Sequence, residues 1–236
     1  MEKLCYVLWK PPSLSGDAFR DGLLGELAPR LLAAGARGLS LLVADAEAES
    51  VAKARITRMD DPLAGMLSVW LEDAGEHRAV EAALGRHASR AAGYLVSESV
   101  PLPDTTRRVA AGERSPGTTL LALLEKPERL TFEEWIRIWH GSHSPLAIEI
   151  QCTHRYVRNV VTRPLTPDAP PWRGIVEEAF PTEAVTDLQR WYRAEGDPAK
   201  MRERLGQMVA SVQRFLDLDR IESHPLGEYR LRSPGD

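Results

Sequence analysis

The stretch Phe132-Glu-Glu-Trp-Ile-Arg-Ile-Trp-His-Gly-Ser-His-Ser-Pro145 is typical of an amphipathic helix that ends in two histidines. Its large apolar residues recur at i, i+3, i+4 and i+7, which places them on one helical face: Phe132, Trp135, Ile136 and Trp139. His140 and His143 continue that face, where Leu would be usual. We expect Pro145 to stop the helix and Ser144 to cap a second short helix over 146–150. His143 would then lie at a kink and face a cleft.

The same stretch is part of an internal repeat. An offset of 116 residues aligns Lys10-Pro11 with Lys126-Pro127, and further similar pairs follow in the same register: Ser15 and Thr131, Phe19 and Trp135, Pro29 and Pro145. In the first copy, Leu24 and Leu27 occupy the positions of the two histidines. Leu is therefore sufficient at these positions when the side chain only has to pack against the core. A merely buried or capping histidine is the alternative explanation of His143.

Composition narrows the class of protein. The chain has 236 residues, 43% of them hydrophobic, and a formal net charge of −4. It has no basic stripe, which argues against nucleic acid as a partner. Cys5 and Cys152 are too far apart in sequence to indicate a zinc site or a disulfide framework. No segment resembles a signal peptide or a membrane span, so we expect a cytoplasmic protein that does not enter a membrane.

Each copy is predicted to have the element order β-α-β-β-α-β. In the first copy we expect strands over 4–9, 39–44, 66–71 and 93–100 and helices over 17–34 and 76–92. In the second we expect strands over 118–125, 153–162, 172–180 and 215–222, the last with or without the region of Tyr229. Its helices are the histidine-bearing one, 182–193 and 198–214. The expected domains are an N-terminal half over 1–105, a linker over 106–117 and a C-terminal half over 118–236 that carries the site.

This order predicts an α+β fold of tandem ferredoxin-like repeats. A β-α-β-β-α-β unit forms an antiparallel sheet with its helices on one face. The bare faces of two such sheets can be buried against each other. We therefore expect the two sheets to face each other, with a ligand site between them or where helix ends meet that space.

The second half resembles the EthD-like family of the dimeric α/β-barrel superfamily. Four motifs carry the resemblance: Phe132-Glu-x-Trp135, Trp139-(x)3-His143-x-Pro145, Arg155-Tyr-Val-Arg-Asn-Val160 and Gly174-Ile-Val-Glu-Glu-Ala-Phe180. Arg173 stands where many relatives have an acidic residue. The resemblance implies a dimeric α/β-barrel fold. Members of this family include proteins needed for ether degradation and anthrone-type dehydratases that act on polyketides. The wider superfamily includes cofactor-free monooxygenases and, more distantly, haem-binding proteins.

Three residues are predicted to be catalytic: His143, Asn159 and Glu177. His143 is the acid/base candidate because an imidazole titrates near neutral pH. Asn159, or Arg158, would donate a hydrogen bond to an oxyanion. Glu177 and Glu178 are consecutive in a strand, so one must face the packed side, where burial would raise the pKa of a carboxyl.

Five further residues are predicted to bind the substrate: Trp139, His140, Tyr156, Arg158 and Trp172. The rings would form a wall for a flat molecule. For each of these residues, a core or surface role is the alternative. His140 and His143 have a spacing compatible with a metal, but no third ligand is evident, so we expect no metal.

Together these features predict an enzyme of cofactor-independent acid/base chemistry, namely dehydration, isomerisation or oxidation, on a small hydrophobic, aromatic or polyketide-like molecule. The alternative is a non-catalytic small-molecule or haem-binding accessory protein. We expect no cofactor; haem and flavin are left open, although no Gly-rich phosphate loop follows a strand. Assembly into a homodimer is also left open.

Overall fold

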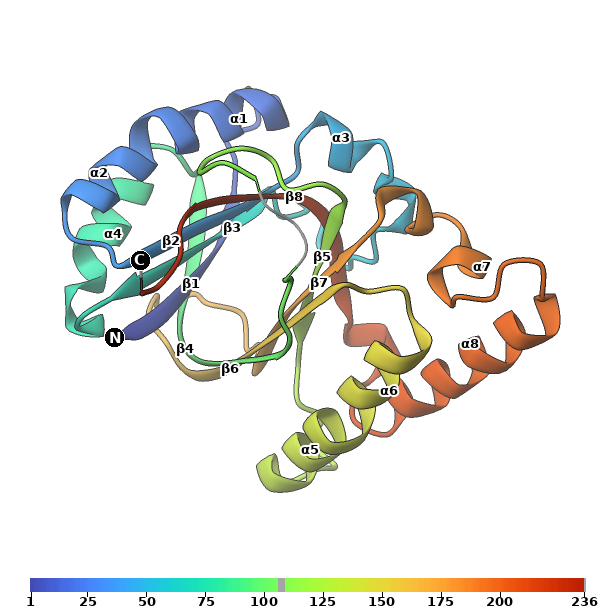
Figure 1. Cartoon of the computed structure of the whole chain (residues 1–236). Helices are drawn as coiled ribbons and strands as arrows, with labels where there is room; N and C mark the ends of the chain where they lie inside the picture. The colour runs from blue at the N-terminus through green and yellow to red at the C-terminus, as the bar shows by residue number, and fades with distance from the viewer. Residues whose placement is uncertain (106–108, 236) are drawn as a thin grey trace.

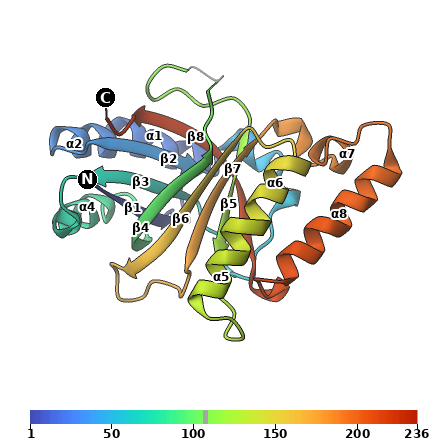
Figure 2. The ribbon, with the colours of Figure 1, turned by 60° about the horizontal axis from the view of Figure 1, so that its bottom comes forward.

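The computed structural model describes residues 1–105 and 109–235, and its eight strands form one closed antiparallel barrel in the order β1-β3-β2-β8-β5-β7-β6-β4. The N-terminal half supplies β1 (Glu2–Trp9), β2 (Gly38–Val43), β3 (Gly65–Leu71) and β4 (Arg90–Leu102). The C-terminal half supplies β5 (Thr118–Leu124), β6 (Arg155–Pro164), β7 (Gly174–Phe180) and β8 (Glu222–Arg232). Figures 1 and 2 show the barrel and the helices around it.

Each half has the strand order of a ferredoxin-like unit. In the first half β1 lies between β3 and β4, and β2 pairs with β3. In the second half β5 lies between β7 and β8, and β6 pairs with β7. The two sheets face each other as expected, and they also join at both edges, through β2–β8 and β4–β6. The expected linker, 106–117, falls between β4 and β5; three of its residues, 106–108, lie outside the described residues.

Apolar side chains fill much of the barrel interior, and a cavity of about 360 Å³ remains at one end of it, lined by inward-facing residues of β2, β3, β4, β6 and β8 that include Trp70, Glu98 and Arg155. Alternate residues of the strands point inward, and their side chains form a buried apolar cluster that includes Val7, Met66, Leu121, Leu123 and Ile175. One region of the interior also carries buried charged groups around Lys3 and Glu177.

Helices cover the outer face of each sheet. In the first half these are α1 (Gly16–Gly22), α2 (Ala28–Ala33) and α4 (His77–Leu84), packed over an apolar cluster that includes Leu4, Phe19 and Leu23. In the second half they are α5 (Phe132–Ile138), α6 (Ser144–Ile150) and α8 (Pro198–Gln213), packed over a cluster that includes Trp135, Trp139 and Phe215. A short helix, α3 (Ala46–Glu49), lies against β8. The two groups of helices lie on opposite sides of the barrel (Figure 1).

Pro145 does not stop the histidine-bearing helix, contrary to expectation. α5 begins at a capping box between Thr131 and Glu134 and continues through a π-helical turn, η4 (Trp139–His143), into α6. In a π turn, the carbonyl of residue i accepts a hydrogen bond from the N–H of residue i+5. Pro145 has no N–H, so the His140 carbonyl receives no backbone hydrogen bond from it. The Arg158 guanidinium donates to that carbonyl at 3.3 Å and replaces the lost bond.

The first half has the same local structure at the aligned place. There α1 runs into a π turn, η1 (Leu23–Leu27), and Pro29 follows in α2. Both turns begin and end at positions 116 residues apart, so Leu27 and His143 occupy the same position in two similar helices.

Other boundaries differ from the predicted ones. The helix predicted over 76–92 ends at Leu84, because 90–92 already pair with β1. The helix predicted over 182–193 reduces to η5 (Thr182–Ala184) and α7 (Leu188–Trp191). The last strand is Glu222–Arg232 rather than 215–222, since Phe215 and Leu216 pack under α5 and α6. Within the described residues, none of the helices combines the length and apolar character needed to span a membrane.

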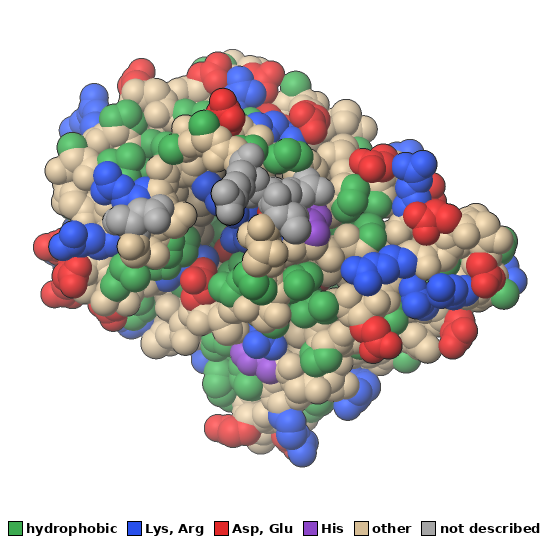
Figure 3. All heavy atoms as spheres, in the orientation of Figure 1, with side chains coloured by type: hydrophobic (Ala, Val, Ile, Leu, Met, Phe, Trp, Pro, Cys, Tyr) green, Lys and Arg blue, Asp and Glu red, His purple; other side chains and the backbone are tan. Residues whose placement is uncertain are grey.

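Acidic and basic side chains are interspersed on the face seen in Figure 3. That face shows no continuous basic stripe.

Candidate functional site

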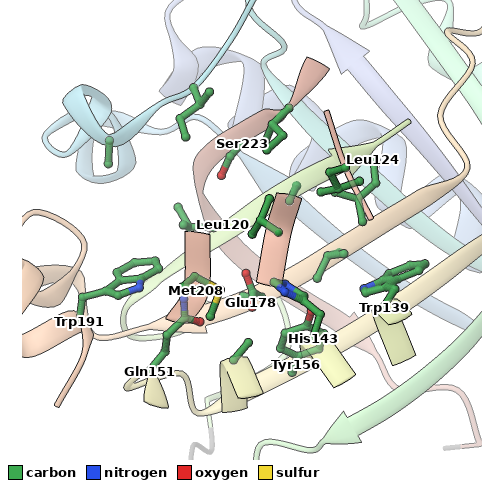
Figure 4. Close-up of a pocket in the computed structure, with 18 of the residues that line it drawn as sticks. Leu120, Leu124, Trp139, His143, Gln151, Tyr156, Glu178, Trp191, Met208 and Ser223 are labelled. Carbon is green, nitrogen blue, oxygen red and sulfur yellow. The ribbon is translucent and has the colours of Figure 1, made fainter. Parts of the chain in front are cut away.

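A cavity of about 400 Å³ lies outside the barrel, between the outer face of the C-terminal sheet and the helices that cover it. Its floor is formed by β5, β6, β7 and β8, and its walls by η4, α6, α7 and α8. From the described part of the first half, Ala54 and Ile56 reach the cavity. Ile56 reaches the cavity through a bridge to Ser223 of β8. Figure 4 shows how the side chains converge from these elements.

The walls of the cavity are mostly apolar and aromatic. Five aromatic residues line it: Trp139, Tyr156, Trp191, Tyr192 and Phe215. Trp139 can approach the sheet only because residue 174 is glycine: a Cβ there would lie 2.7 Å from the Trp139 ring. The Gly174 motif is therefore a packing requirement for the tryptophan wall. Such a wall suits a flat, apolar ligand.

His143 reaches the cavity from the end of the π turn. Its Nδ1 lies 3.0 Å from the Ser211 hydroxyl of α8, and its ring packs 4.6 Å from Phe215. Because Nδ1 is engaged, Nε2 is the nitrogen left for a ligand. Burial lowers the pKa of His143 to about 4, so the ring is neutral at pH 7. π turns recur at functional sites because they re-aim side chains within a helix.

Among the described residues that line the cavity, Glu178 is the only acidic one. It is half-buried in β7, where its carboxyl makes no hydrogen bond or ion pair with the described residues. Burial without a partner disfavours the charged form and raises the pKa of Glu178 to about 7. Figure 4 shows Glu178 and His143 directed into the same cavity. Glu178 can therefore take up or release a proton near neutral pH.

Glu177 and Asn159 lie on the other side of the sheet, in the barrel interior. Glu177 accepts hydrogen bonds from Lys3 (3.1 Å), Arg155 (3.1 Å) and the Asn159 amide (3.0 Å). Burial would raise the pKa of Glu177, but Lys3, Arg155 and Asn159 hold it at about 2. Glu177 is thus a permanently charged carboxylate in an ion-pair network, and the structure does not bring it or Asn159 to the cavity.

The remaining predicted residues separate into three places. Trp139 and Tyr156 line the cavity with His143. Trp172 is buried in the barrel interior, where its ring lies 5.9 Å from Tyr94. His140 and Arg158 do not line the cavity. His140 packs edge-on against Trp139 at 4.6 Å, and Arg158 also donates to Ser99 at 3.1 Å.

Glu178 could be identified from the sequence only if the pairing of β6 with β7 were known. Tyr156 pairs with Glu178 across β6 and β7, so both point to the same face. In the sequence neither face of 153–162 is cleanly apolar, so strand alternation alone could not choose between Glu177 and Glu178. The second half has one helix more than the first between its last two strands; α7 and α8 together close the cavity, and α8 supplies Ser211.

The described residues contain no group of three or more His, Cys, Asp and Glu side chains that could hold a metal ion. His140 and His143 do not converge on one point, because only His143 faces the cavity. A haem or flavin nucleotide would bring carboxylates or phosphates into this space. None of the described residues that line the cavity is Lys or Arg, so the residues present do not fit either group.

Comparison with known proteins finds a domain family that matches part of the chain. Residues 127–219 match the EthD domain family. No curated protein sequence matches the chain. All of the solved structures described next share 10% identity or less with the chain and therefore bear on the fold alone.

An anthrone oxidase-like protein aligns over 100% of this chain and 93% of its own, with 10% identity and a TM-score of 0.54. A putative monooxygenase of Fusobacterium nucleatum aligns over 98% and 92%, with 6% identity and a TM-score of 0.54. A dye-decolorizing peroxidase of Bacteroides thetaiotaomicron aligns over 98% and 93%, with 7% identity and a TM-score of 0.52. The cavity thus lies within the matched segment and its flanks, and the C-terminal half of the chain carries an EthD domain within a fold of the dimeric α/β-barrel type.

Proposed function

We propose that the protein is a small-molecule enzyme that performs acid/base chemistry on an aromatic or polyketide-like substrate in this cavity, without a cofactor. The observation that carries the proposal is the unpaired Glu178 carboxyl facing an apolar cavity that also holds His143. No hydrogen bond or ion pair with the described residues holds this carboxyl, and burial makes its ionisation cost free energy. Groups kept at such a cost are candidates for proton transfer.

Glu178 is assigned the proton transfer. A general acid or base works best when its pKa lies near the operating pH, and Glu178, with a pKa of about 7, meets this condition better than His143, with a pKa of about 4. In its ionised form Glu178 removes a proton from carbon next to a carbonyl or phenol. The same group then returns the proton, either to another carbon in an isomerisation or to a departing hydroxyl in a dehydration.

His143 is assigned the role of hydrogen-bond donor to the substrate oxygen. It acts as a neutral imidazole whose Nε2 hydrogen-bonds to the carbonyl oxygen that becomes an enolate or phenolate. The Ser211 hydroxyl positions the ring through Nδ1. If the Ser211 hydroxyl donates to Nδ1, the Nε2–H is fixed as a donor. Asn159, Arg158 and Glu177 have no part in this assignment, because they lie outside the cavity.

Anthrone is a suitable first substrate, since one protein with a similar fold is an anthrone oxidase-like protein. The test is the exchange of the anthrone methylene protons for deuterium, followed by mass spectrometry under anaerobic conditions. Anaerobic exchange reports proton removal alone, so it does not depend on whether the reaction ends in dehydration, isomerisation or oxidation.

We expect the Glu178→Gln variant to exchange about 10²–10⁴-fold more slowly than the parent protein. Glu149→Gln, which changes an exposed carboxyl on α6, is the matched control and should leave the rate unchanged. The parent rate should rise with pH up to about 7 and then level off, since the ionised carboxylate is the base. Equal rates in the parent protein and Glu178→Gln would show that the assignment is wrong.

The alternative, a non-catalytic binding protein, would use the same cavity. It predicts binding of anthrone without faster exchange. A haem-binding role is further disfavoured by the lack of a cationic side chain along the described cavity wall. Absorbance of the purified protein after incubation with haem tests that role directly.

A further inference from the structure

The charges around the cavity indicate which ligands can enter it. We propose that the cavity selects uncharged ring compounds bearing a hydroxyl or carbonyl group and rejects organic anions of the same size. This inference rests on the proposed function, because it concerns the same cavity. It adds the charge class of the substrate, which the acid/base chemistry leaves open.

The described residues that line the cavity around Glu178 come from several elements, and none of them is Lys or Arg. His143 comes from η4, Tyr156 from β6 and Tyr192 from the end of α7. The side chains from β5 and α8 that line the cavity are apolar, as at Leu120 and Met208. His143 stays neutral at pH 7 because it is buried.

A carboxylate ligand would therefore meet an electrostatic penalty. It would lose its hydration in an apolar space without gaining a cation, and an unpaired buried charge costs several kcal/mol. Above pH 7 it would also meet ionised Glu178, and two carboxylates that share a site retain one proton between them. A hydroxyl or carbonyl group has no such cost, since it can hydrogen-bond to Glu178 or to Nε2 of His143.

The charged residues of the barrel interior show the contrast. Lys3 and Arg155 pair with Glu177, and Arg155 also pairs with Glu228 at 3.0 Å. The same sheet thus pairs Glu177 with cations on one face, while on the other face no described Lys or Arg lines the cavity that holds Glu178. A site for anions would need the cations that this fold places inside the barrel.

The experiment compares 1-naphthol with 1-naphthoate, which have the same ring system and differ in charge at pH 6–8. Binding to the full chain is measured by calorimetry in two buffers of different ionisation enthalpy, which reports proton uptake. We expect naphthol to bind with nearly constant affinity and no proton uptake. Naphthoate should bind at least about tenfold more weakly at pH 8 and take up a proton, losing about tenfold in affinity per pH unit above 7.

Three variants locate the effect. Glu178→Gln should abolish the pH dependence of naphthoate binding. Val212→Phe, which fills the cavity from α8, should weaken naphthol binding, whereas Val209→Phe on the exposed face of α8 should not. Thermal unfolding of each variant checks that the fold is retained.

Naphthoate binding as tight as that of naphthol at pH 8 would overturn the proposal, and so would failure of both compounds to bind. Because these experiments measure binding and not catalysis, their outcome is independent of the test of the proposed function. Selective binding without anthrone exchange would refute the enzyme while leaving the charge selectivity in place. Anthrone exchange without selective binding would refute the charge selectivity while leaving the enzyme proposal in place.

Discussion

Replacement of Glu178 by Gln should stabilise the protein, and only above about pH 5. Burial raises the pKa of Glu178 from an ordinary 4.5 to about 7. A carboxyl with a raised pKa in the folded state carries no penalty below its unfolded pKa. It costs stability as pH rises through 4.5, and the full cost is reached above the folded pKa. Gln has the same shape but no charge to bury.

The expected magnitude follows from the two pKa values. One pKa unit corresponds to about 1.4 kcal/mol, so the shift corresponds to roughly 3 kcal/mol at most. Glu178 is half-buried and water in the cavity will screen it, so we expect the variant to gain about 1–3 kcal/mol at pH 8. At pH 4 the parent protein and the variant should have nearly the same free energy of unfolding.

The assay is urea unfolding followed by tryptophan fluorescence from pH 4 to pH 9, with the dependence on urea concentration required to stay unchanged. Glu177→Gln is the control from the next residue of the same strand. Its carboxyl pairs with Lys3 and Arg155. Lys3 keeps Glu98 and Arg155 keeps Glu228 when this carboxylate is lost, so the change should destabilise by about 1–3 kcal/mol at neutral pH. A Glu178→Gln variant that is less stable at pH 8, or equally changed at all pH values, would refute this account of the cavity.

Three further predictions concern the residues around the cavity. Ser211→Ala should slow anthrone exchange about tenfold and move the pH profile, while Ser211→Thr, which keeps the hydroxyl, should restore both; exchange rates across pH 5–9 measure this. The pKa values of His140 and His143 are lowered to about 4, the former by burial and by Arg158 and the latter by burial. Their contribution to stability is therefore present above pH 6.5 and lost as pH falls towards 4, and His143→Gln should reduce the acid destabilisation seen in urea titrations. Gly174→Ala would place a Cβ 2.7 Å from the Trp139 ring. It should cost about 1–3 kcal/mol of stability and weaken naphthol binding, as thermal unfolding and calorimetry would show, whereas an unchanged melting temperature would contradict the close packing.

Local sequence patterns determined the elements and the fold class. Apolar spacing predicted the helix from Phe132, and strand alternation with glycines predicted most strands within a few residues. The EthD-like motifs around His143 and Gly174 predicted the matched family. These features depend on neighbours in the chain, which is why they can be read from the sequence. Pro145 was misjudged because its missing hydrogen bond is replaced by Arg158 on a strand.

The composition of the site was decided by tertiary structure. Whether Glu177 or Glu178 faces the cavity depends on the register of β7 against β6. Whether a carboxyl is neutralised depends on residues remote in sequence, as with Lys3 beside Glu177 and the absence of any described cation beside Glu178. The cavity beside His143 lies outside the barrel, because it is formed between the outer face of β5–β8 and the helices packed over that face. Contacts of this kind join residues that the linear order keeps apart, so the sequence alone placed His143 at a site, while the fold decided which carboxyl accompanies it.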